Sequence, residues 1–178
     1  EALCQRHNLA LIVDAVFLDY PLEAAAELTS FARGPHPALT FVLSGMSKIA
    51  GLPQMKTAWI ATLGPEQAKR QALARLEVIA DTFLSMNAPV QLALPAWLDR
   101  RGQIQEQILD RVRRNLAIAQ AGGVEVLRAE AGWCAILRLP QFGNADPALE
   151  ILQSTGVIVH PGAFYGIAEA GRVVVSLL

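Results

Sequence analysis

Apolar residues form short continuous runs in the first part of the chain. Residues 9–13, 39–43 and 59–63 are almost entirely apolar and are bounded by polar residues, Gly or Pro. Runs of this length are typical of strands buried on both faces, as in a parallel sheet. The period then changes, and apolar residues at helical spacing predict an amphipathic helix over 65–86. They stand at Ala68, Ala72, Leu76, Ile79 and Phe83.

Two further segments have a helical pattern. A short helix is expected over about 22–32, because Pro21 suits a first-turn position. A longer helix is expected over roughly 90–121, bent or broken near Pro95 and ended by Gly122-Gly123. This second helix is long for a globular protein, so we expect it to link two domains.

The pattern changes again after Gly123. Residues 124–128 and 133–139 alternate like strands of a half-exposed sheet. A helix should begin at Asp146-Pro147, with Asp as the N-cap, and continue through Gln153. Two more strands are expected over 157–160 and 173–178.

The predicted fold class is α/β. We expect part of a large domain with a parallel or mixed sheet, followed by a small α+β C-terminal domain. The predicted ranges are 1–95 for the partial large domain, 96–122 for the linking helix and 123–178 for the small domain. Residues 1–8 resemble the last turns of a helix, and residues 173–178 an interrupted apolar strand, which predicts a fragment of a longer protein.

Composition and charge limit the kinds of binding partner that we expect for this chain. The net charge is −1, which gives no electrostatic reason to expect nucleic acid or an anionic membrane as partner. No apolar run is long enough to cross a bilayer, and residues 1–6 do not have the pattern of a signal peptide. The apolar share is 53%, so we expect self-association. Cys4 and Cys134 lack metal-ligand or CxxC spacing, which predicts partly buried, reduced thiols in a cytoplasmic protein and no metal site.

The segment around Lys48 carries the clearest chemistry. Lys48 follows an apolar strand, is preceded by Ser44 and Ser47, and is followed by a Gly-Leu-Pro turn. A lysine held in this way can act as a nucleophile toward a carbonyl. The serines offer hydroxyl donors, and Lys56 offers a charge for a phosphate. Taken alone, the Ser-Lys pair is better explained as part of a surface loop. Taken alone, Asp14 at the end of the first strand is better explained as a carboxylate that caps a turn.

The order of these segments resembles the class I/II, fold-type I aminotransferases, which depend on pyridoxal 5'-phosphate (PLP). A strand ends in Asp14, another ends in Ser-x-x-Ser-Lys, and a cation follows the lysine by eight residues. Residues 161–166, Pro-Gly-Ala-Phe-Tyr-Gly, resemble the family's Pro-Gly-x-x-Phe-Gly loop. The resemblance covers nearly the whole chain and implies that it is the C-terminal portion of a family member. It implies Lys48 as the catalytic lysine that binds PLP, with Asp14 pairing with the pyridine nitrogen. The cofactor-binding positions that it implies are Asp14, Phe17, Ser44, Ser47, Lys48 and Lys56.

Four positions depart from the family pattern. Phe17 stands where many members have Tyr, Gly45 where many have Ser, and Lys56 where the phosphate-binding Arg is usual. Val174 stands where the family has the Arg that binds the substrate carboxylate. Arg172 lies two residues earlier on the same strand face, and we do not expect it to replace the missing Arg.

The resemblance therefore implies a fragment of a transaminase, which transfers an amino group between an amino acid and a 2-oxo acid and assembles as a homodimer. The alternative is a catalytically silent aminotransferase-like domain acting in dimerisation or scaffolding. The departures at Phe17, Gly45 and Val174 favour the silent domain. Asp14 and Lys48 at strand ends favour the enzyme.

Overall fold

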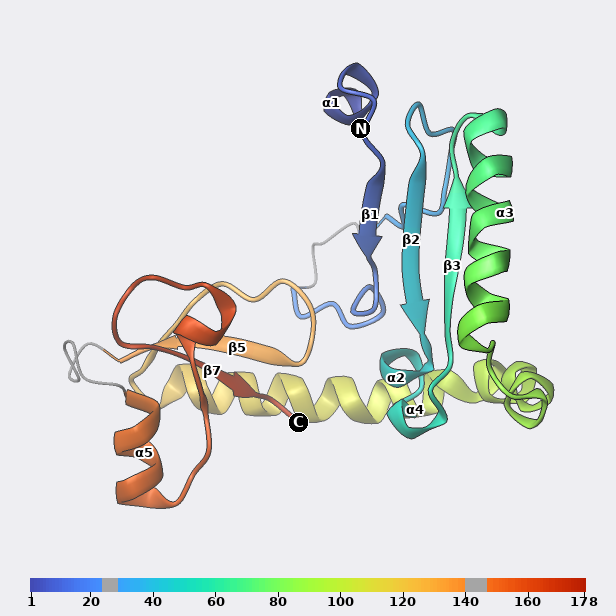
Figure 1. The fold of residues 1–178 in the computed structure, drawn as a ribbon. Helices are drawn as coiled ribbons and strands as arrows, with labels where there is room; N and C mark the ends of the chain where they lie inside the picture. Colours follow the sequence, from blue (N-terminus) through green and yellow to red (C-terminus); the bar gives the residue numbers. More distant parts are fainter. Residues whose placement is uncertain (24–28, 140–146) are drawn as a thin grey trace. The chain divides into compact units, whose positions relative to one another are not determined.

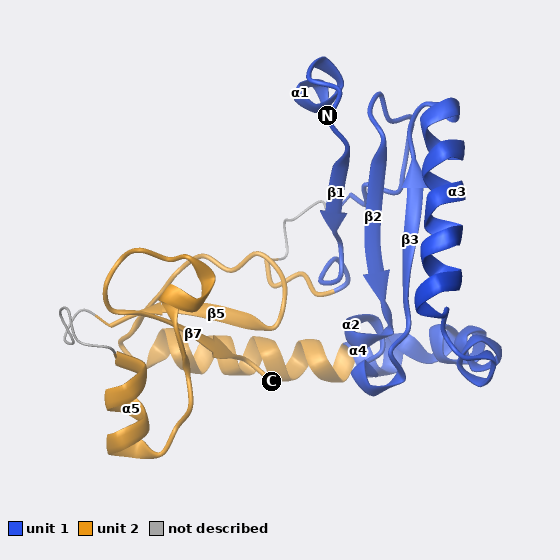
Figure 2. Cartoon of the chain, viewed as in Figure 1, with its two compact units in different colours: residues 1–19, 27–105 blue, residues 20–26, 106–178 orange. Residues whose placement is uncertain are grey.

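The computed structural model describes residues 1–23, 29–139 and 147–178. The chain divides into two compact units, shown in different colours in Figure 2. Unit 1 comprises residues 1–19 and 27–105, and unit 2 comprises residues 20–26 and 106–178. The domain ranges expected from the sequence stay a prediction.

The sheet of unit 1 has three strands, labelled in Figure 1. They are β1 (Leu11–Asp14), β2 (Thr40–Gly45) and β3 (Ala58–Leu63), in the order β1-β2-β3. β1 is parallel to β2, and β2 is antiparallel to β3. The sheet is therefore mixed, which agrees with one of the two arrangements that the sequence predicted.

One expectation about this sheet is wrong. The continuous apolar run predicted that β1 is buried on both faces, but Ile12 is 66% exposed. The register pairs Ile12 with Phe41 and Phe41 with Thr62, so Ile60, two residues before Thr62, lies on the same face and is 45% exposed. A run of apolar residues shows that a strand can be buried, but not which of its side chains something packs against.

The helices of unit 1 begin with α1 (Ala2–Arg6), followed by α2 (Met46–Ile49) and the short 3₁₀ helix η1 (Pro53–Met55). α3 (Glu66–Phe83) runs alongside β3 in Figure 1 and confirms the amphipathic helix expected over 65–86. The short helix expected over 22–32 is not seen at Leu22, Glu23 or 29–32, and its remaining residues lie outside the described part of the chain.

α4 (Ala88–Ala121) is the long helix expected over 90–121. It is capped at its start, where the Val90 N–H donates to Asn87 Oδ1 at 3.0 Å. The helix continues through Pro95, so the alternative of a complete break at this residue is wrong. Pro95 lies within the second turn, where its lack of an N–H removes only one hydrogen bond from a helix of 34 residues.

Unit 2 contains a four-stranded antiparallel sheet in the order β4-β5-β7-β6. Its core is formed by Leu139, Ala148 and Val173. The strands confirm the predicted change to a sheet of alternating residues after Gly123, but they are shorter than expected at 124–128 and 157–160. The elements are β4 (Glu125–Val126), β5 (Cys134–Arg138), α5 (Pro147–Thr155), β6 (His160–Pro161), the 3₁₀ helix η3 (Gly162–Tyr165) and β7 (Arg172–Ser176). The expected N-cap, Asp146, lies outside the described residues.

The two cysteines are free, as the sequence predicted. Cys134 is exposed, however, and not partly buried, because it lies on the outer face of β5.

Over the ranges that the structure describes, no helix is both long and apolar enough to traverse a bilayer. Within the same ranges no three His, Cys, Asp or Glu side chains are grouped as metal ligands.

Candidate functional site at one edge of the unit 1 sheet

Asp14 and the segment that carries Lys48 lie at the same edge of the sheet. β1 and β2 are parallel, and Asp14 is paired with Leu43, two residues before β2 ends. The Ala15 N–H then donates to the Leu43 carbonyl at 3.0 Å, which holds the chain that follows β1 against the end of β2. This is the edge at which open α/β sheets bind ligands.

The Asp14 side chain is exposed and shapes the turn that follows it. Its Oδ1 accepts a hydrogen bond from the Val16 N–H at 3.2 Å. The alternative interpretation of Asp14, as a turn-capping carboxylate, is therefore correct for one of its oxygens. The other oxygen has no hydrogen-bond donor among the described residues.

Lys48 lies on α2, which follows β2 directly. A helix of four residues is not stable alone, so its position depends on tertiary contacts. Met46 is fully buried, and its N–H donates to the Thr57 carbonyl at 3.0 Å. At the other end, Gln105 Nε2 donates to the Ile49 carbonyl at 3.0 Å. The backbone of Lys48 is held on both sides.

The supporting residues Met46, Thr57 and Gln105 were not found from the sequence. Gln105 lies 56 residues from its acceptor on α2, and Thr57 acts through its backbone carbonyl. A long-range contact of this kind has no local sequence pattern. The buried Thr57 side chain, whose Oγ1 donates to the Met55 carbonyl at 3.1 Å, further orders the chain before β3.

The Lys48 side chain contacts Phe17. Its Nζ lies 5.5 Å from the centroid of the Phe17 ring, over the ring face. This distance is within the range of a cation–π interaction. Phe17 belongs to the turn that Asp14 shapes. The contact therefore joins the chain after β1 to the helix after β2.

Gly45 departs from the family pattern for a steric reason. Its φ of 176° is extended and suits any residue. A Cβ at this position, however, would lie 2.6 Å from the Thr57 carbonyl oxygen and 3.0 Å from Ala58 Cα. Both of these atoms are backbone, so they cannot rotate away. The close approach of β2 and β3 excludes the serine that many family members have here.

The remaining predicted cofactor residues are placed differently. Ser44 pairs with Trp59, and strand alternation puts it on the opposite sheet face from Leu43 and Asp14. Ser47 is half-buried on α2. Lys56 is exposed and adopts the left-handed conformation, with φ 51° and ψ 42°. This backbone conformation is uncommon for a residue other than Gly, Asn or Asp, and often marks a functional position.

In unit 2, the strand that lacks the family's substrate-binding Arg is β7. Val174 is half-buried and lies between Ile136 and His160. Arg172 lies on the same face of β7 and is paired with Arg138 of β5. The Nη1 of Arg138 donates a hydrogen bond to Glu125 Oε2 at 3.1 Å. Arg172 Nη1 is buried and has no hydrogen-bond partner in the described part of the chain.

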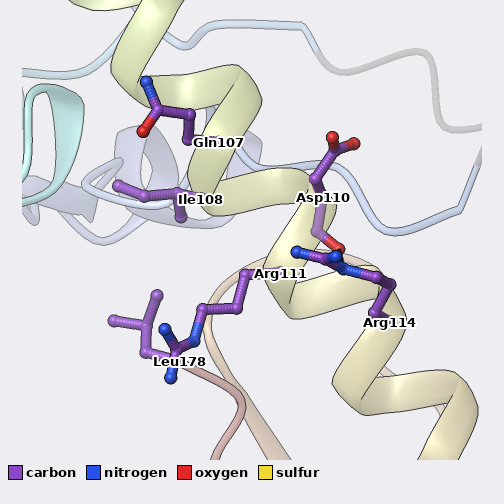
Figure 3. Close-up of a pocket in the computed structure, with 6 residues that line it drawn as sticks. All are labelled: Gln107, Ile108, Asp110, Arg111, Arg114 and Leu178. Carbon is purple, nitrogen blue, oxygen red and sulfur yellow. Dashed lines mark hydrogen bonds between the residues drawn. The ribbon is translucent and has the colours of Figure 1, made fainter.

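Unit 2 also has a surface cavity of about 670 Å³ along α4. Figure 3 shows Arg111 and Arg114 extending from neighbouring turns of this helix, with Asp110 beside them. The Arg114 Nε donates to the Asp110 carbonyl at 3.3 Å. None of the predicted cofactor residues lines this cavity. Its lining residues are Gln107, Ile108, Asp110, Arg111, Arg114 and Leu178.

The donor set at the edge of the unit 1 sheet has a distinct chemistry. It combines the Asp14 carboxylate with two side-chain amines, those of Lys48 and Lys56. An amine can bind a carbonyl carbon, a carboxylate can pair with a protonated ring nitrogen, and an ammonium can face a phosphate. The types of donor therefore match those that a phosphorylated pyridine aldehyde requires.

Comparison with known proteins identifies the family. Residues 1–177 match the family described as aminotransferase class I and II. The chain therefore belongs to this family. It is 23% identical over 146 residues to an alanine aminotransferase of Mycobacterium bovis, covering 82% of this chain. It is 28% identical over 106 residues to a glutamate-pyruvate aminotransferase of Escherichia coli, covering 60% of this chain.

Solved structures agree on the fold. A tyrosine aminotransferase of Leishmania infantum matches 99% of this chain with a TM-score of 0.84 and 18% identity. An aspartate aminotransferase double mutant of Thermus thermophilus matches 99% with a TM-score of 0.80 and 20% identity. The chain spans 31% and 26% of the two curated relatives, and 46% of each of these two structures.

Proposed function

We propose that this chain is the C-terminal, lysine-bearing portion of a PLP-dependent transaminase, and that Lys48 binds the cofactor. One observation carries the proposal. In a chain of this family, Lys48 reaches the turn that follows Asp14, with its Nζ 5.5 Å from the Phe17 ring. The amine and the carboxylate thus belong to two segments in contact at one sheet edge.

Each residue has a defined task in this proposal. Bound PLP supplies an electron sink for bonds at the amino-bearing carbon. Asp14 offers its second carboxylate oxygen to the ring nitrogen and keeps that nitrogen protonated. Lys48 would hold the cofactor covalently through its Nζ, with loss of water, and would move a proton to and from the amino-bearing carbon. Lys56 faces the phosphate as a point charge, since a lysine lacks the bidentate geometry of an arginine. Ser47, on the helix of Lys48, is a hydroxyl donor, and Ser44 offers a second hydroxyl from the opposite face of the sheet.

The substrates in this proposal are an amino acid and a 2-oxo acid. The names of the curated relatives, alanine aminotransferase and glutamate-pyruvate aminotransferase, support this class. Val174 cannot hold a carboxylate, because its side chain carries no charge or donor. The substrate carboxylate is therefore held by a group other than the residue at position 174.

The proposed assembly is a homodimer in the cytoplasm. Support comes from exposed apolar side chains, such as Val78 and Phe83 of α3, which are 66% and 80% exposed. Monomeric proteins rarely leave such side chains grouped on their surface.

Borohydride reduction tests the cofactor assignment. The protein is incubated with PLP, reduced and digested, and the peptides are analysed by mass spectrometry. We expect the phosphopyridoxyl label on Lys48, because the Lys48 amine contacts the turn that follows Asp14. Lys48→Ala should abolish the label. Lys69→Ala is the matched control and should retain it, because Lys69 pairs with Glu66 on α3 at 2.7 Å.

Two outcomes would contradict the proposal. Label on another lysine, with Lys48 unmodified, would remove the assignment of Lys48. A protein that takes up no label at all and shows no visible absorption band with added PLP would favour the silent domain. That alternative is supported by the departures at Phe17, Gly45 and Val174.

A further inference from the structure

We propose that Phe17 is a positioning residue for Lys48: the face of the Phe17 ring holds the Lys48 ammonium at the sheet edge. The inference rests on the proposed function only for the use that the protein makes of Lys48. It concerns a residue that departs from the family pattern, because many members have Tyr at this position.

The position of the ring is set by the turn after β1. The Ala15 N–H donates to the Leu43 carbonyl at 3.0 Å, and the Leu18 N–H donates to the Ala15 carbonyl at 3.1 Å. Between them, the Val16 N–H donates to Asp14 Oδ1 at 3.2 Å. Three hydrogen bonds therefore order the backbone on both sides of Phe17. The turn therefore sets the backbone position from which the Phe17 ring extends toward Lys48.

The position of the amine is set independently, from the other side. Lys48 lies on α2 between the buried Met46 and the Ile49 carbonyl that Gln105 binds. Two ordered segments thus bring the ring and the ammonium to 5.5 Å, inside the range of about 6 Å in which a ring face attracts a cation. Both residues are half-buried, so water only partly weakens the attraction.

The charge distribution of the ring determines which form of the amine it attracts. A phenyl face attracts an ammonium through its quadrupole but does not attract the neutral amine in the same way. Phe17 also has no oxygen that could take a proton from Lys48. The contact therefore holds the charged Nζ beside the turn of Asp14 whenever Lys48 is not bound to a carbonyl carbon.

A series of fluorinated side chains tests this inference. Residue 17 is replaced by phenylalanines that carry one, two or three ring fluorines, which weaken the quadrupole stepwise at nearly constant shape. The rate at which an amine-reactive reagent modifies Lys48 is measured at neutral pH without added PLP, by peptide mapping. Lys56 and Lys69 of the same sample serve as internal controls. We expect the Lys48 rate to rise stepwise by about two- to fivefold in total, because a weaker quadrupole holds the Lys48 side chain less firmly against the ring.

Two further variants distinguish the effect of the aromatic ring from the effect of side-chain size. Phe17→Leu keeps an apolar side chain and removes the ring, so it should raise the Lys48 rate by a similar factor. Phe17→Tyr keeps the ring and should leave the rate near that of the native protein.

A Lys48 rate that is constant along the fluorine series overturns the inference. So does a rise that Lys56 and Lys69 share, because that would reflect a general change in structure. The measurement uses no cofactor, and its failure is therefore distinct from a failure of the borohydride labelling.

Discussion

Gly45 shows how a single position is determined by the atoms around it. The residue joins β2 to α2, and the backbone of Thr57 and Ala58 lies against the place that a side chain would fill. Lys48 follows three residues later. A change at Gly45 therefore affects the strand pairing and the helix of the proposed cofactor lysine together.

We expect Gly45→Ala to destabilise unit 1 by about 1–3 kcal/mol, the usual cost of forcing extra atoms into a packed site. The added Cβ would lie 2.6 Å from the Thr57 carbonyl oxygen. Gly102→Ala is the control, because no atom lies within 4 Å of the place that a methyl group would take on this helical glycine. The control should stabilise the protein by about 0.5–1 kcal/mol. Urea unfolding of both variants checks the pair, and equal stabilities would contradict the steric explanation.

At the scale of elements, a short segment at residues 20–23 is tied to the β4–β5 region of unit 2. Tyr20 is fully buried, and its ring meets Trp133 edge-on with a centroid distance of 5.1 Å. The Leu22 N–H donates to the Glu130 carbonyl at 2.8 Å. Glu23 accepts two hydrogen bonds from Arg128, at 2.8 and 2.7 Å. The hydrogen bond and the charge of Arg128 lower the pKa of Glu23 below its usual 4.5.

The lowered pKa of Glu23 predicts a pH dependence. The pair stabilises the folded state above pH 4.5, the usual pKa of a glutamate, and this contribution is lost as the pH falls through the lower pKa of the folded state. The Glu23→Gln variant should therefore lose less stability than the native protein when the pH is lowered from about 5 to about 3.

Thermal melts at both pH values measure this difference. The effect should be small, because the pair is exposed to solvent. Glu77→Gln, on α3 and outside this pair, is the control. Identical acid dependence in the native protein and in Glu23→Gln would show that the pair does not contribute.

At the scale of the whole molecule, the distribution of apolar surface is unusual. Unit 1 exposes large apolar side chains on its sheet and on α3, among them Ile12, Ile60, Val78 and Phe83. Of the residues, 53% are apolar, and many of their side chains are not buried within the chain. Apolar surface of this kind usually marks a contact with another chain or segment.

We expect a solution of this chain to self-associate as its concentration is raised. Light scattering at tens of micromolar, the range of ordinary affinities, should give a mass above that of one chain. Because burial of apolar surface drives the association, added salt should not reverse it. A stable monomer over the whole concentration range would contradict this expectation, and dissociation by salt would indicate an association through charges.

Local patterns determined a large part of this structure. Short apolar runs gave strands close to β1, β2 and β3, and the 3.6-residue period gave α3 almost to its ends. The position of Asp14 at the end of β1 also followed from the sequence, because a strand ends where the apolar run ends. Lys48 was expected at a strand end as well, but it lies on α2, three residues after β2 ends. The family could be recognised in the same way, since it depends on the order of such segments along the chain.

Other features were decided only by the tertiary structure. The exposure of Ile12, the space that excludes a side chain at Gly45 and the contact of Lys48 with Phe17 all depend on residues far apart in the sequence. The support of α2 by Gln105 is of the same kind. A local pattern records which face of an element can be buried and where the element ends. Which atoms it then meets depends on how the chain closes over tens of residues, and that is determined by packing.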